Sequence, residues 1–345
     1  MNKKRSILEK YSFKNDYSEG AHPAILQKLI ETNLIQTKGY GEDEFCNEAR
    51  ELIQKHLKKE ADIHFVSGGT QANLIVISAI LKPFESVIAA ESGHIAVHET
   101  GAIEATGHKV NTIATDDGKI SPTQITKVLQ THTDEHMVKP KMIYISNSTE
   151  VGSVYTKNEL QEIYTFCQEK KLILFVDGAR LGSALTSSKC DLTLEDMANL
   201  CDVFYIGGTK NGALIGEAIV FNNLSLSDNF RFHIKQKGGM LAKGRLIGIQ
   251  FSELFRNDLF FELGRNANNM AKLLAENITN KGYQFLTEPS SNQIFPIFPD
   301  EIIEKLQQHF EFYIWQKIDE KNSAIRLVSS WATTKESVTN FINQL

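Results

Sequence analysis

A lysine emerges directly after an apolar run in the segment YIGGTKNG, residues 205–212. An apolar strand end withdraws Lys210 from water, and desolvation lowers the pKa of an amine. A neutral amine is what a carbonyl cofactor needs in order to form a Schiff base. An ordinary loop lysine beside a tight turn is the alternative for this segment taken alone. A phosphate loop of the form GxxxxGKS or GxxxxGKT is excluded, because Asn211 follows the lysine.

A carboxylate ends another predicted strand, in FVDGAR at residues 175–180. A buried Asp is tolerated only when it is paired, and the protonated nitrogen of a pyridine ring is a suitable partner for Asp177. The resulting cation makes such a ring an electron sink. Arg180 has the planar fork that binds a carboxylate or a phosphate. A structural Asp–Arg pair at a strand end is the alternative, but the company of Lys210 favours a cofactor site.

A glycine turn lies between a strand and a helix in VSGGTQAN, residues 66–73, and the helix is predicted to begin at about Thr70. Free backbone amides at a helix N-terminus suit a phosphate monoester, and the Thr70 hydroxyl adds a donor. A turn that only permits tight packing is the alternative. The spacing is not GxGxxG, which argues against a dinucleotide.

A histidine follows the apolar run SVIAA in the segment ESGH and opens the segment that carries His98. The imidazole of His94 can stack on an aromatic cofactor and exchange protons near its face. A surface or core histidine is the alternative. A functional role for His94 is therefore favoured only because the three other motifs are also present. Open α/β sheets bind ligands at the carboxyl ends of their strands, so the four motifs belong to one predicted site.

Short apolar runs alternate with amphipathic stretches from about residue 61 to 221, a pattern that predicts parallel strands covered by helices. We therefore expect an α/β protein. The clearest strands are rich in β-branched or aromatic residues: SVIAA (86–90), KMIYIS (141–146), LILFVD (172–177), DVFYIG (202–207) and GEAIVF (216–221). A capping box from Thr156 to Glu159 predicts a crossover helix over 156–171.

The pattern changes after Phe221, where the basic segment HIKQKGGMLAKGR precedes a long predicted helix over 245–280. A smaller α+β domain with the strands NQIFPIF and AIRLVS fits the remainder, and a second capping box, Thr333 to Glu336, predicts the final helix. Because no Gly/Ser-rich linker separates the two parts, they should pack tightly. We expect a large cofactor-binding domain over residues 1–250 and a small domain over 251–345.

Composition limits the classes of partner. The 345 residues carry 37 basic and 42 acidic side chains, a net charge of −5 without a long block of either sign, so no nucleic-acid partner is expected. Residues 1–10 are charged and no long apolar run follows them, which predicts a cytoplasmic protein without a membrane span. The cysteines at 46, 167, 190 and 201 form no CxxC pair, so they predict buried thiols and no metal site.

The four strand-end motifs occur in this order and spacing in the threonine aldolase and aromatic amino acid β-eliminating lyase family of fold-type I pyridoxal-phosphate enzymes. The chain resembles this family from about Phe13 to its end. The resemblance rests on SGGTQAN, ESGH with HETGA, FVDGAR with LGSAL, and GGTKNG with GEAIVF. It implies pyridoxal 5′-phosphate as cofactor and an aspartate-aminotransferase-like α/β fold, with a mostly parallel sheet in the large domain and a smaller α+β C-terminal domain.

Carried over position by position, the resemblance implies roles for the cofactor-binding residues. Lys210 would hold pyridoxal phosphate as a Schiff base, and Asp177 would bind the pyridine nitrogen. Gly69 and Thr70 would bind the phosphate group. His94 would stack on the ring and stand ready to exchange a proton.

The resemblance also implies where the substrate and a neighbouring subunit bind. Arg180 would contact the cofactor hydroxyl or the substrate carboxylate, and Arg326, in AIRLVSSWATT, would clamp that carboxylate. Asn15, in KND, is a further substrate-binding candidate. Family members are dimers or tetramers with active sites at subunit interfaces, so Tyr40 and the basic segment over 235–243 are expected to serve a neighbour's site.

One position departs from the family. Many low-specificity threonine aldolases carry a histidine in the loop that here reads STEVG, residues 148–152, and the matching residue is Glu150. That histidine is a candidate for contacting the β-hydroxyl group of the substrate. Glu150 would accept the same proton, or the loop would serve a bulkier aryl β-carbon, and both interpretations stay open. The catalytic base is accordingly His94, Glu150 or an ordered water molecule.

The predicted activity is cleavage of an L-3-hydroxy amino acid, of the L-threonine, L-allo-threonine or phenylserine type, to glycine and an aldehyde. A β-eliminating lyase or an aminotransferase on the same fold is the alternative, since it would use the same Lys210 and Asp177 but break a Cα–H bond first. A non-catalytic binding protein is the competitor from another class. The intact set of Lys210, Asp177 and His94 argues against it.

Overall fold

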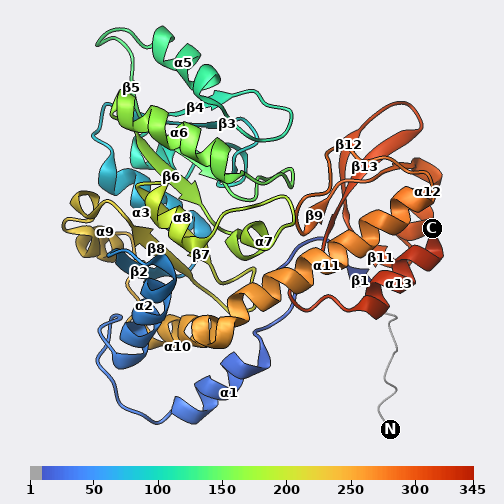
Figure 1. Ribbon diagram of the computed structural model, residues 1–345, viewed down its shortest axis with the longest axis horizontal. Helices are drawn as coiled ribbons and strands as arrows, with labels where there is room; N and C mark the ends of the chain where they lie inside the picture. Colours follow the sequence, from blue (N-terminus) through green and yellow to red (C-terminus); the bar gives the residue numbers. More distant parts are fainter. Residues whose placement is uncertain (1–9) are drawn as a thin grey trace.

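The computed structural model describes residues 10–345, and its largest element is a seven-stranded sheet (Figure 1). In spatial order the strands are β2 (Asp62–Val66), β8 (Glu217–Phe221), β7 (Val203–Gly207), β6 (Ile173–Asp177), β5 (Lys139–Ser146), β3 (Glu85–Ala90) and β4 (Val110–Ile113). Only β8 runs against the others, because it is antiparallel to both of its neighbours. The predicted α/β class with a mostly parallel sheet is confirmed.

Helices cover both faces of this sheet, which explains why its central strands are apolar along their whole length. One face carries α3 (Gly69–Ile80), α4 (His94–Val97) and α9 (Phe230–Gln236). The other carries α1 (Pro23–Thr32), α2 (Glu44–Leu57), α5 (Pro122–Thr131), α6 (Lys157–Lys170), α7 (Leu181–Leu185), α8 (Leu194–Asn199) and α10 (Arg245–Phe255). Alternate residues of a strand therefore enter two different cores: Val220 packs on one face and Ile219 on the other.

The five buried strands predicted from the sequence are all present, each within a residue or two of its expected limits. The crossover helix α6 begins as predicted, since Thr156 and Glu159 form the reciprocal hydrogen bonds of a capping box. Strong apolar runs and capping pairs are local signals, so the sequence alone locates these elements well.

The long helix predicted over 245–280 is wrong as a continuous element. Helix α10 ends at Phe255, a short 3-10 turn η3 (Arg256–Asp258) follows, and α11 (Leu259–Asn280) then begins in a new direction. Asn257 and Asp258 both have left-handed backbone angles, with φ of 55° and 60°. Asn and Asp tolerate this conformation better than other non-glycine residues, and the resulting kink directs α11 away from the large sheet (Figure 1).

A second, smaller group of elements surrounds the far end of α11 (Figure 1). Its sheet consists of β10 (Ile297–Pro299), β13 (Asn322–Val328) and β12 (Tyr313–Lys317), with β9 (Gln293–Ile294) also pairing with β13. Helices α12 (Asp300–Leu306) and α13 (Lys335–Gln344) complete it. The predicted capping box at Thr333 is wrong: Thr334 caps α13 through the Ser337 amide, while the Thr333 hydroxyl accepts a hydrogen bond from the Ser330 amide.

The beginning of the described chain packs with this smaller group. Strand β1 (Tyr11–Ser12) pairs with β11 (Phe310–Glu311), and Phe13 lies in the same hydrophobic cluster as Phe298 and Phe341. The division into domains at residue 250 stays a prediction. The short 3-10 turns η1 (Glu104–Thr106) and η2 (Leu224–Leu226) complete the elements, and residues 1–9, on which part of the predicted location depends, lie outside the described residues.

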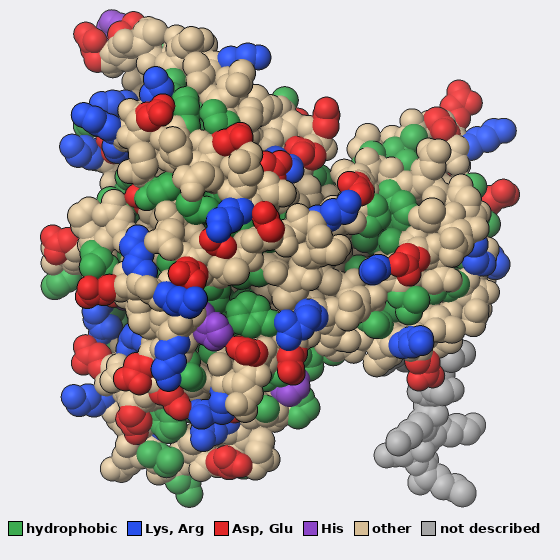
Figure 2. All heavy atoms as spheres, in the orientation of Figure 1, with side chains coloured by type: hydrophobic (Ala, Val, Ile, Leu, Met, Phe, Trp, Pro, Cys, Tyr) green, Lys and Arg blue, Asp and Glu red, His purple; other side chains and the backbone are tan. Residues whose placement is uncertain are grey.

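Two lobes of unequal size are visible in the space-filling view, with an indentation between them on the upper side (Figure 2). Acidic and basic side chains are interspersed over the face that the figure shows. Among the helices of residues 10–345, none combines the length and the apolar character that crossing a bilayer requires.

Gly248 provides a test of the helix packing, because it lies where α10 crosses α2. A Cβ atom at this position would lie 2.5 Å from the Cys46 Sγ and 2.6 Å from the Cys46 backbone nitrogen. Since backbone atoms move only at a cost, we expect Gly248→Ala to lower the free energy of unfolding by about 2–3 kcal/mol. Urea denaturation followed by circular dichroism measures this. Gly20→Ala, whose added Cβ meets nothing within 4 Å, is the control, and equal midpoints for the two variants would contradict the prediction.

Candidate active site

The predicted site residues follow strands that end at one edge of the large sheet. Asp177 is the last residue of β6, and Lys210 lies in the turn after β7. His94 begins α4 after β3, and Gly69 begins α3 after β2. Parallel strands present their carboxyl ends at the same edge, so the sheet itself gathers these four segments.

Lys210 is half-buried, and its Nζ lies 6.0 Å from the centroid of the Tyr17 ring. Burial lowers the pKa of its amine, and the neighbouring Arg180 charge lowers that pKa further. The carboxylates of Asp16 and Asp177 act in the opposite direction without restoring the ordinary value. A lysine with a lowered pKa holds a larger share of neutral, nucleophilic amine near neutral pH.

Asp177 is buried at the centre of this edge and is well supplied with hydrogen bonds. Its Oδ2 accepts hydrogen bonds from the Tyr144 hydroxyl and, at 3.2 Å, from Asn73 Nδ2. Its Oδ1 accepts the Ala179 amide at 2.9 Å. Burial raises the pKa of Asp177, but the charge of His94 and these hydrogen bonds outweigh burial, so the pKa is lowered on balance. The carboxylate therefore stays ionised although it is buried.

His94 is joined to Asp177 through two buried side chains that the sequence reasoning missed. The His94 Nδ1 lies 2.8 Å from Glu99 Oε1. Asn73 Nδ2 donates to that same Glu99 oxygen at 2.8 Å as well as to Asp177. The Glu99 carboxylate thus sets the orientation of the imidazole ring. Both residues lie inside motifs quoted above, HETGA and SGGTQAN, but their mutual contact could not be read from either motif.

The N-terminus of α3 faces the same edge. The helix begins at Gly69, one residue earlier than predicted, and its N-cap, Gly68, makes no side-chain capping hydrogen bond. Its first backbone amides are therefore free of a side-chain cap, as an anion site requires. A Cβ at Gly69 would lie 2.9 Å from the Tyr205 hydroxyl oxygen, so the close approach of α3 to β7 needs glycine here. Thr70 is exposed beside these amides.

Glu150 approaches from the loop after β5. Its Oε1 accepts the His94 backbone amide at 3.1 Å and the Ser146 hydroxyl at 2.8 Å. Burial raises the pKa of the Glu150 carboxyl, and the Asp177 charge raises it further. A carboxyl group whose pKa is raised is suited to accept and return a proton near neutral pH.

Arg180 is engaged in an ion pair that its motif did not predict. Its Nε and Nη2 donate to the two carboxylate oxygens of Asp16 at 2.7 and 3.0 Å. Asn292 donates to the same carboxylate at 2.9 Å, and Asp16 is 1% exposed. One edge of the guanidinium fork, predicted to bind a cofactor or substrate oxygen, is thus occupied by Asp16. The only sequence signal for this residue was its place in KND.

Arg326 lies on β13, and its Cζ is 5.2 Å from the centroid of the Tyr313 ring and 5.3 Å from that of Trp315. Its Nη2 donates to the Lys14 carbonyl at 3.1 Å. Its buried Nε has no hydrogen-bond partner among the described residues. A buried donor without a hydrogen bond is costly, and a carboxylate ligand would satisfy it.

Asn15 belongs to a local turn next to these residues. Its side-chain oxygen accepts hydrogen bonds from the Tyr17 amide and the Ser18 hydroxyl, each at 3.0 Å. The side-chain oxygen is thereby used within the turn. The Arg180 charge, by contrast, lowers the pKa of both Lys210 and Arg326. A role for Asn15 in substrate binding stays a prediction.

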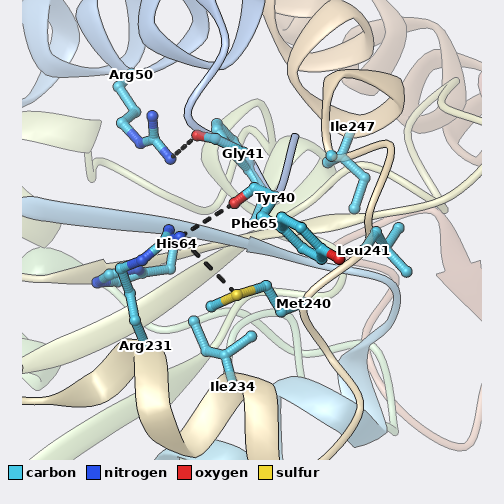
Figure 3. A pocket seen from close by; sticks show the side chains of 11 residues that line it. Tyr40, Gly41, Arg50, His64, Phe65, Arg231, Ile234, Met240, Leu241 and Ile247 are labelled. Atoms are coloured by element: carbon cyan, nitrogen blue, oxygen red, sulfur yellow. Dashed lines mark hydrogen bonds between the residues drawn. The ribbon is translucent and has the colours of Figure 1, made fainter. Parts of the chain in front are cut away.

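Tyr40 lines a separate pocket on the α9 face of the molecule (Figure 3). Its carbonyl oxygen accepts a hydrogen bond from Arg231 at 3.3 Å, and the Lys235 Nζ lies 4.8 Å from the centroid of its ring. The cavity measures about 30 Å³, which is room for a water molecule and not for a substrate. Tyr40 and Phe232 remain 46% and 75% exposed at this face.

The residues at the sheet edge fit pyridoxal phosphate. Lys210 supplies an amine with a lowered pKa, and Asp177 supplies a buried carboxylate that remains ionised. The N-terminus of α3 supplies backbone amides without a side-chain cap. These match the carbonyl carbon, the ring nitrogen and the phosphate group of the cofactor, respectively.

Comparison with known proteins supports the predicted family. The family described as β-eliminating lyase matches residues 16–300. The chain belongs to the β-eliminating lyase family. It is 30% identical over 330 residues to the low specificity L-threonine aldolase of Pseudomonas aeruginosa, an alignment that covers 94% of each chain. The resemblance inferred from the four strand-end motifs is thereby confirmed.

Solved structures agree with this membership. A threonine aldolase structure from Leishmania major is 48% identical, has a TM-score of 0.95 and covers 96% of this chain and 98% of that one. A single mutant of the aspartate aminotransferase of Thermus thermophilus is only 13% identical, with a TM-score of 0.72 over 97% of this chain and 90% of that one. The second similarity concerns the fold alone, and it confirms the predicted aspartate-aminotransferase-like architecture of this family member.

The pair between Asp16 and Arg180 leads to a stability prediction. Asp16→Ala leaves a buried guanidinium without its partner, so we expect the free energy of unfolding at pH 7 to fall by about 3 kcal/mol. Burial raises the pKa of Asp16, but Arg180 and Lys210 outweigh burial and lower it from the ordinary 3.8. The pair therefore stabilises the fold above about pH 4, and its contribution is lost as the pH falls through the lowered value.

Urea denaturation of the wild type and of Asp16→Ala between pH 3 and pH 7 measures the free energy of unfolding of each protein. The difference between the two free energies should become smaller toward pH 3. Glu288→Ala, which breaks the exposed pair with Lys189, is the control and should change stability by less than about 1 kcal/mol. If the two variants are equally stable at pH 7, the pair does not hold the N-terminal segment in place.

Proposed function

We propose that this protein is a pyridoxal-phosphate-dependent aldolase that cleaves an L-3-hydroxy amino acid, of the L-threonine, L-allo-threonine or phenylserine type, to glycine and an aldehyde. The observation that carries the proposal is the placement of Lys210, with its lowered amine pKa, at the same sheet edge as the ionised Asp177. The 48% identity to a threonine aldolase from Leishmania major over nearly the whole chain supports the same reaction.

The arrangement of the sheet edge supports the proposed cofactor-binding roles. Lys210 would hold the aldehyde carbon and Asp177 the ring nitrogen, while Gly69 and Thr70 would bind the phosphate at the start of α3. His94, whose ring is oriented by Glu99, would stack on the cofactor ring. When bound, pyridoxal phosphate supplies an electron sink that accepts the charge left on the substrate when a bond to Cα breaks. An ionised Asp177 keeps the ring nitrogen protonated and so maintains that sink.

Arg326 binds the substrate carboxylate, with Arg180 and Asn15 beside it. Two aromatic rings hold the plane of the Arg326 guanidinium, and its Nε has no hydrogen-bond partner among residues 10–345. A fixed guanidinium orients an amino acid about its carboxylate, and that orientation selects which bond to Cα is broken. Arg180, which is anchored by Asp16, provides a second positive charge whose field lowers the pKa of Arg326.

Glu150 is the proposed acceptor for the proton of the β-hydroxyl group. It lies in the loop where many low-specificity threonine aldolases have a histidine, and its pKa is raised by burial and by Asp177. His94 is the second candidate, since its backbone amide donates to Glu150 and the two side chains lie at the same edge. Removal of the hydroxyl proton lets the bond between Cα and Cβ break with release of an aldehyde.

We also propose that the protein forms a homodimer or a homotetramer. Ile30 in α1 and Leu34 just after it are 72% and 91% exposed, and Phe232 on α9 is 75% exposed. Exposed apolar side chains of this size are costly in water and are covered well by a second copy of the chain. Tyr40, Lys235 and the segment up to Lys243 would then face a neighbouring active site. A cytoplasmic location stays a prediction.

The cofactor and the reaction are tested together. The purified protein mixed with pyridoxal phosphate should show the absorbance band of a lysine-bound cofactor, and addition of L-threonine should yield glycine and acetaldehyde in equal amounts. Lys210→Ala should lose both the band and the products, because the amine proposed to bind the cofactor is gone. Lys189→Ala, at an exposed lysine, is the control and should retain both.

Phenylserine is offered in parallel, with benzaldehyde as the measured product. Products of elimination or transamination, in place of glycine and an aldehyde, would move the reaction to the alternative class on the same fold. A wild-type protein that forms no band would refute the proposed cofactor.

Glu150 is tested through the pH dependence of the reaction. As a base it must be ionised, so kcat/KM of the wild type should rise as the pH passes through the raised pKa of Glu150. Glu150→Gln should lower kcat by about 100-fold and lose this acid limb. Glu288→Gln, at a carboxyl on the surface, is the matched control. An unchanged pH profile in Glu150→Gln would assign the proton transfer to His94 or to water.

A further inference from the structure

The position of Glu150 depends on the loop that carries it, the Glu150 loop, which spans residues 147–153 after β5. The carboxylate oxygen Oε1 accepts the His94 backbone amide at 3.1 Å and the Ser146 hydroxyl at 2.8 Å. Both donors belong to elements of the large sheet, and neither of these bonds holds the backbone of the loop. A side chain stays at a fixed place only if its own backbone is supported. The contacts of the loop backbone therefore decide where the carboxylate lies.

Side chains that precede or begin β9 bind the backbone on both sides of Glu150. Gln293 Nε2 donates a hydrogen bond to the Thr149 carbonyl at 3.3 Å, and the Thr287 hydroxyl donates to the Val151 carbonyl at 3.0 Å. These two carbonyls belong to the residues immediately before and after Glu150. The donors lie 144 and 136 positions further along the chain, so the contacts are tertiary and not part of a local turn.

A third contact brings the two segments into direct backbone contact. The Ser291 hydroxyl donates to the Gly152 carbonyl at 2.9 Å. Gly152 has a φ of 85°, and a Cβ atom at this position would lie 2.6 Å from the Gln293 carbonyl oxygen. Only glycine combines this backbone angle with so close an approach. The Glu150 loop therefore rests on the backbone at residue 293.

The donors stand on a firm support. Gln293 is 1% exposed and begins β9, where it pairs with Val328 of β13. Strand β9 lies on the side of the smaller group that faces the large sheet (Figure 1). The intervening residue, Asn292, donates to the Ser329 carbonyl at 2.8 Å and to the Asp16 carboxylate at 2.9 Å. The segment that holds the Glu150 loop is thus itself fixed by a strand and by two further hydrogen bonds.

The large sheet holds the other side of the Glu150 loop. The Thr149 and Ser153 hydroxyls both donate to the Asp117 carbonyl, at 3.2 and 2.6 Å. A loop supported on one side only can swing about that support, whereas a loop supported on both sides cannot. The bonds from the smaller group therefore supply the second support.

We propose that Thr287, Ser291 and Gln293 are positioning residues, whose side chains hold the Glu150 loop and thereby fix the place of its carboxylate. They act through Glu150 and touch no reacting atom in this role. The catalytic consequence rests on the proposed function, in which Glu150 accepts the proton of the β-hydroxyl group. The position of the carboxylate is a property of the protein alone and can be measured without cofactor.

The His94 backbone amide reports that position. It donates to Glu150 Oε1, so its hydrogen exchanges more slowly while the carboxylate stays in place. In the double variant Thr287→Val, Gln293→Met, which lacks both donors beside Glu150, we expect this amide to exchange about tenfold faster. The neighbouring Gly93 amide, bound to a carbonyl of its own turn, should keep its rate. Hydrogen exchange of the cofactor-free protein, followed residue by residue by NMR, measures both amides.

Two single variants are the controls for this exchange measurement. Gln284→Met replaces an exposed glutamine between α11 and β9, and Thr287→Ser retains the hydroxyl donor. Both should show the wild-type rate at His94. Thr287→Val alone, at a partly exposed position, serves if the double variant fails to fold, and it should raise the rate about threefold. A wild-type rate at His94 in the folded variants that lack a donor would overturn the proposal.

The pH profile of the reaction distinguishes positioning from a general loss of stability. Burial raises the pKa of the Glu150 carboxyl and the Asp177 charge raises it further. A loosened loop exposes this carboxyl, so its pKa should fall toward the ordinary value and the acid limb of kcat/KM should move to lower pH. The titratable and charged groups that face it are Asp177, His94, Arg180, Tyr144 and Tyr155.

In the same double variant kcat should fall by about tenfold, because the proton acceptor is displaced, while KM should change by less than about twofold. An acid limb that stays in place in the double variant, although Glu150→Gln loses it, would overturn the proposal. An acid limb that also survives in Glu150→Gln would instead refute Glu150 as the base. The exchange rate at His94 would still decide whether the three side chains position the loop.

Discussion

The buried charge cluster at the edge of the large sheet is the constraint on which the rest of the structure depends. Asp177 ends β6, Lys210 lies in the turn after the neighbouring β7, and Arg180 lies in the turn after Asp177. Buried charges are tolerated only where opposite charges and hydrogen bonds surround them. Tyr144 and Asn73 donate hydrogen bonds to Asp177, so a residue of β5 and a residue of α3 must both lie beside this carboxylate. The strand order that brings these elements together is thus inseparable from the chemistry.

The same cluster explains the path of the chain at its N-terminal end. Strand β1 pairs with β11, far from the large sheet, and the following residues return to bury Asp16 against Arg180. Asn292 binds the same carboxylate from the smaller group of elements. One carboxylate therefore joins the N-terminal segment, the large sheet and the C-terminal elements. Arg326 contacts the same N-terminal segment, since it donates a hydrogen bond to the Lys14 carbonyl. The predicted substrate-binding residues are brought together where the N-terminal segment meets the large sheet and the C-terminal elements.

Local signals were sufficient wherever a few adjacent residues decide the outcome. The buried strands, the capping box at Thr156 and the four strand-end motifs involve short stretches whose hydrophobicity and hydrogen bonding are set by neighbours in sequence. The same reasoning failed at Asn257 and Asp258, because a left-handed kink in a stretch of otherwise helical period leaves little trace in the pattern. The sequence also did not distinguish Thr333 from Thr334, the actual cap of α13, because adjacent threonines offer the same hydroxyl.

The sequence by itself determined the α/β class, the family, and the residues that carry the proposed chemistry, because each of these depends on residue types at fixed local spacing. Only the tertiary structure decided how those residues are paired. Glu99 orients His94, and Asp16 holds Arg180. Such pairs join segments that are distant in the chain. Their partners are chosen by strand order and burial, and neither is encoded in any single motif.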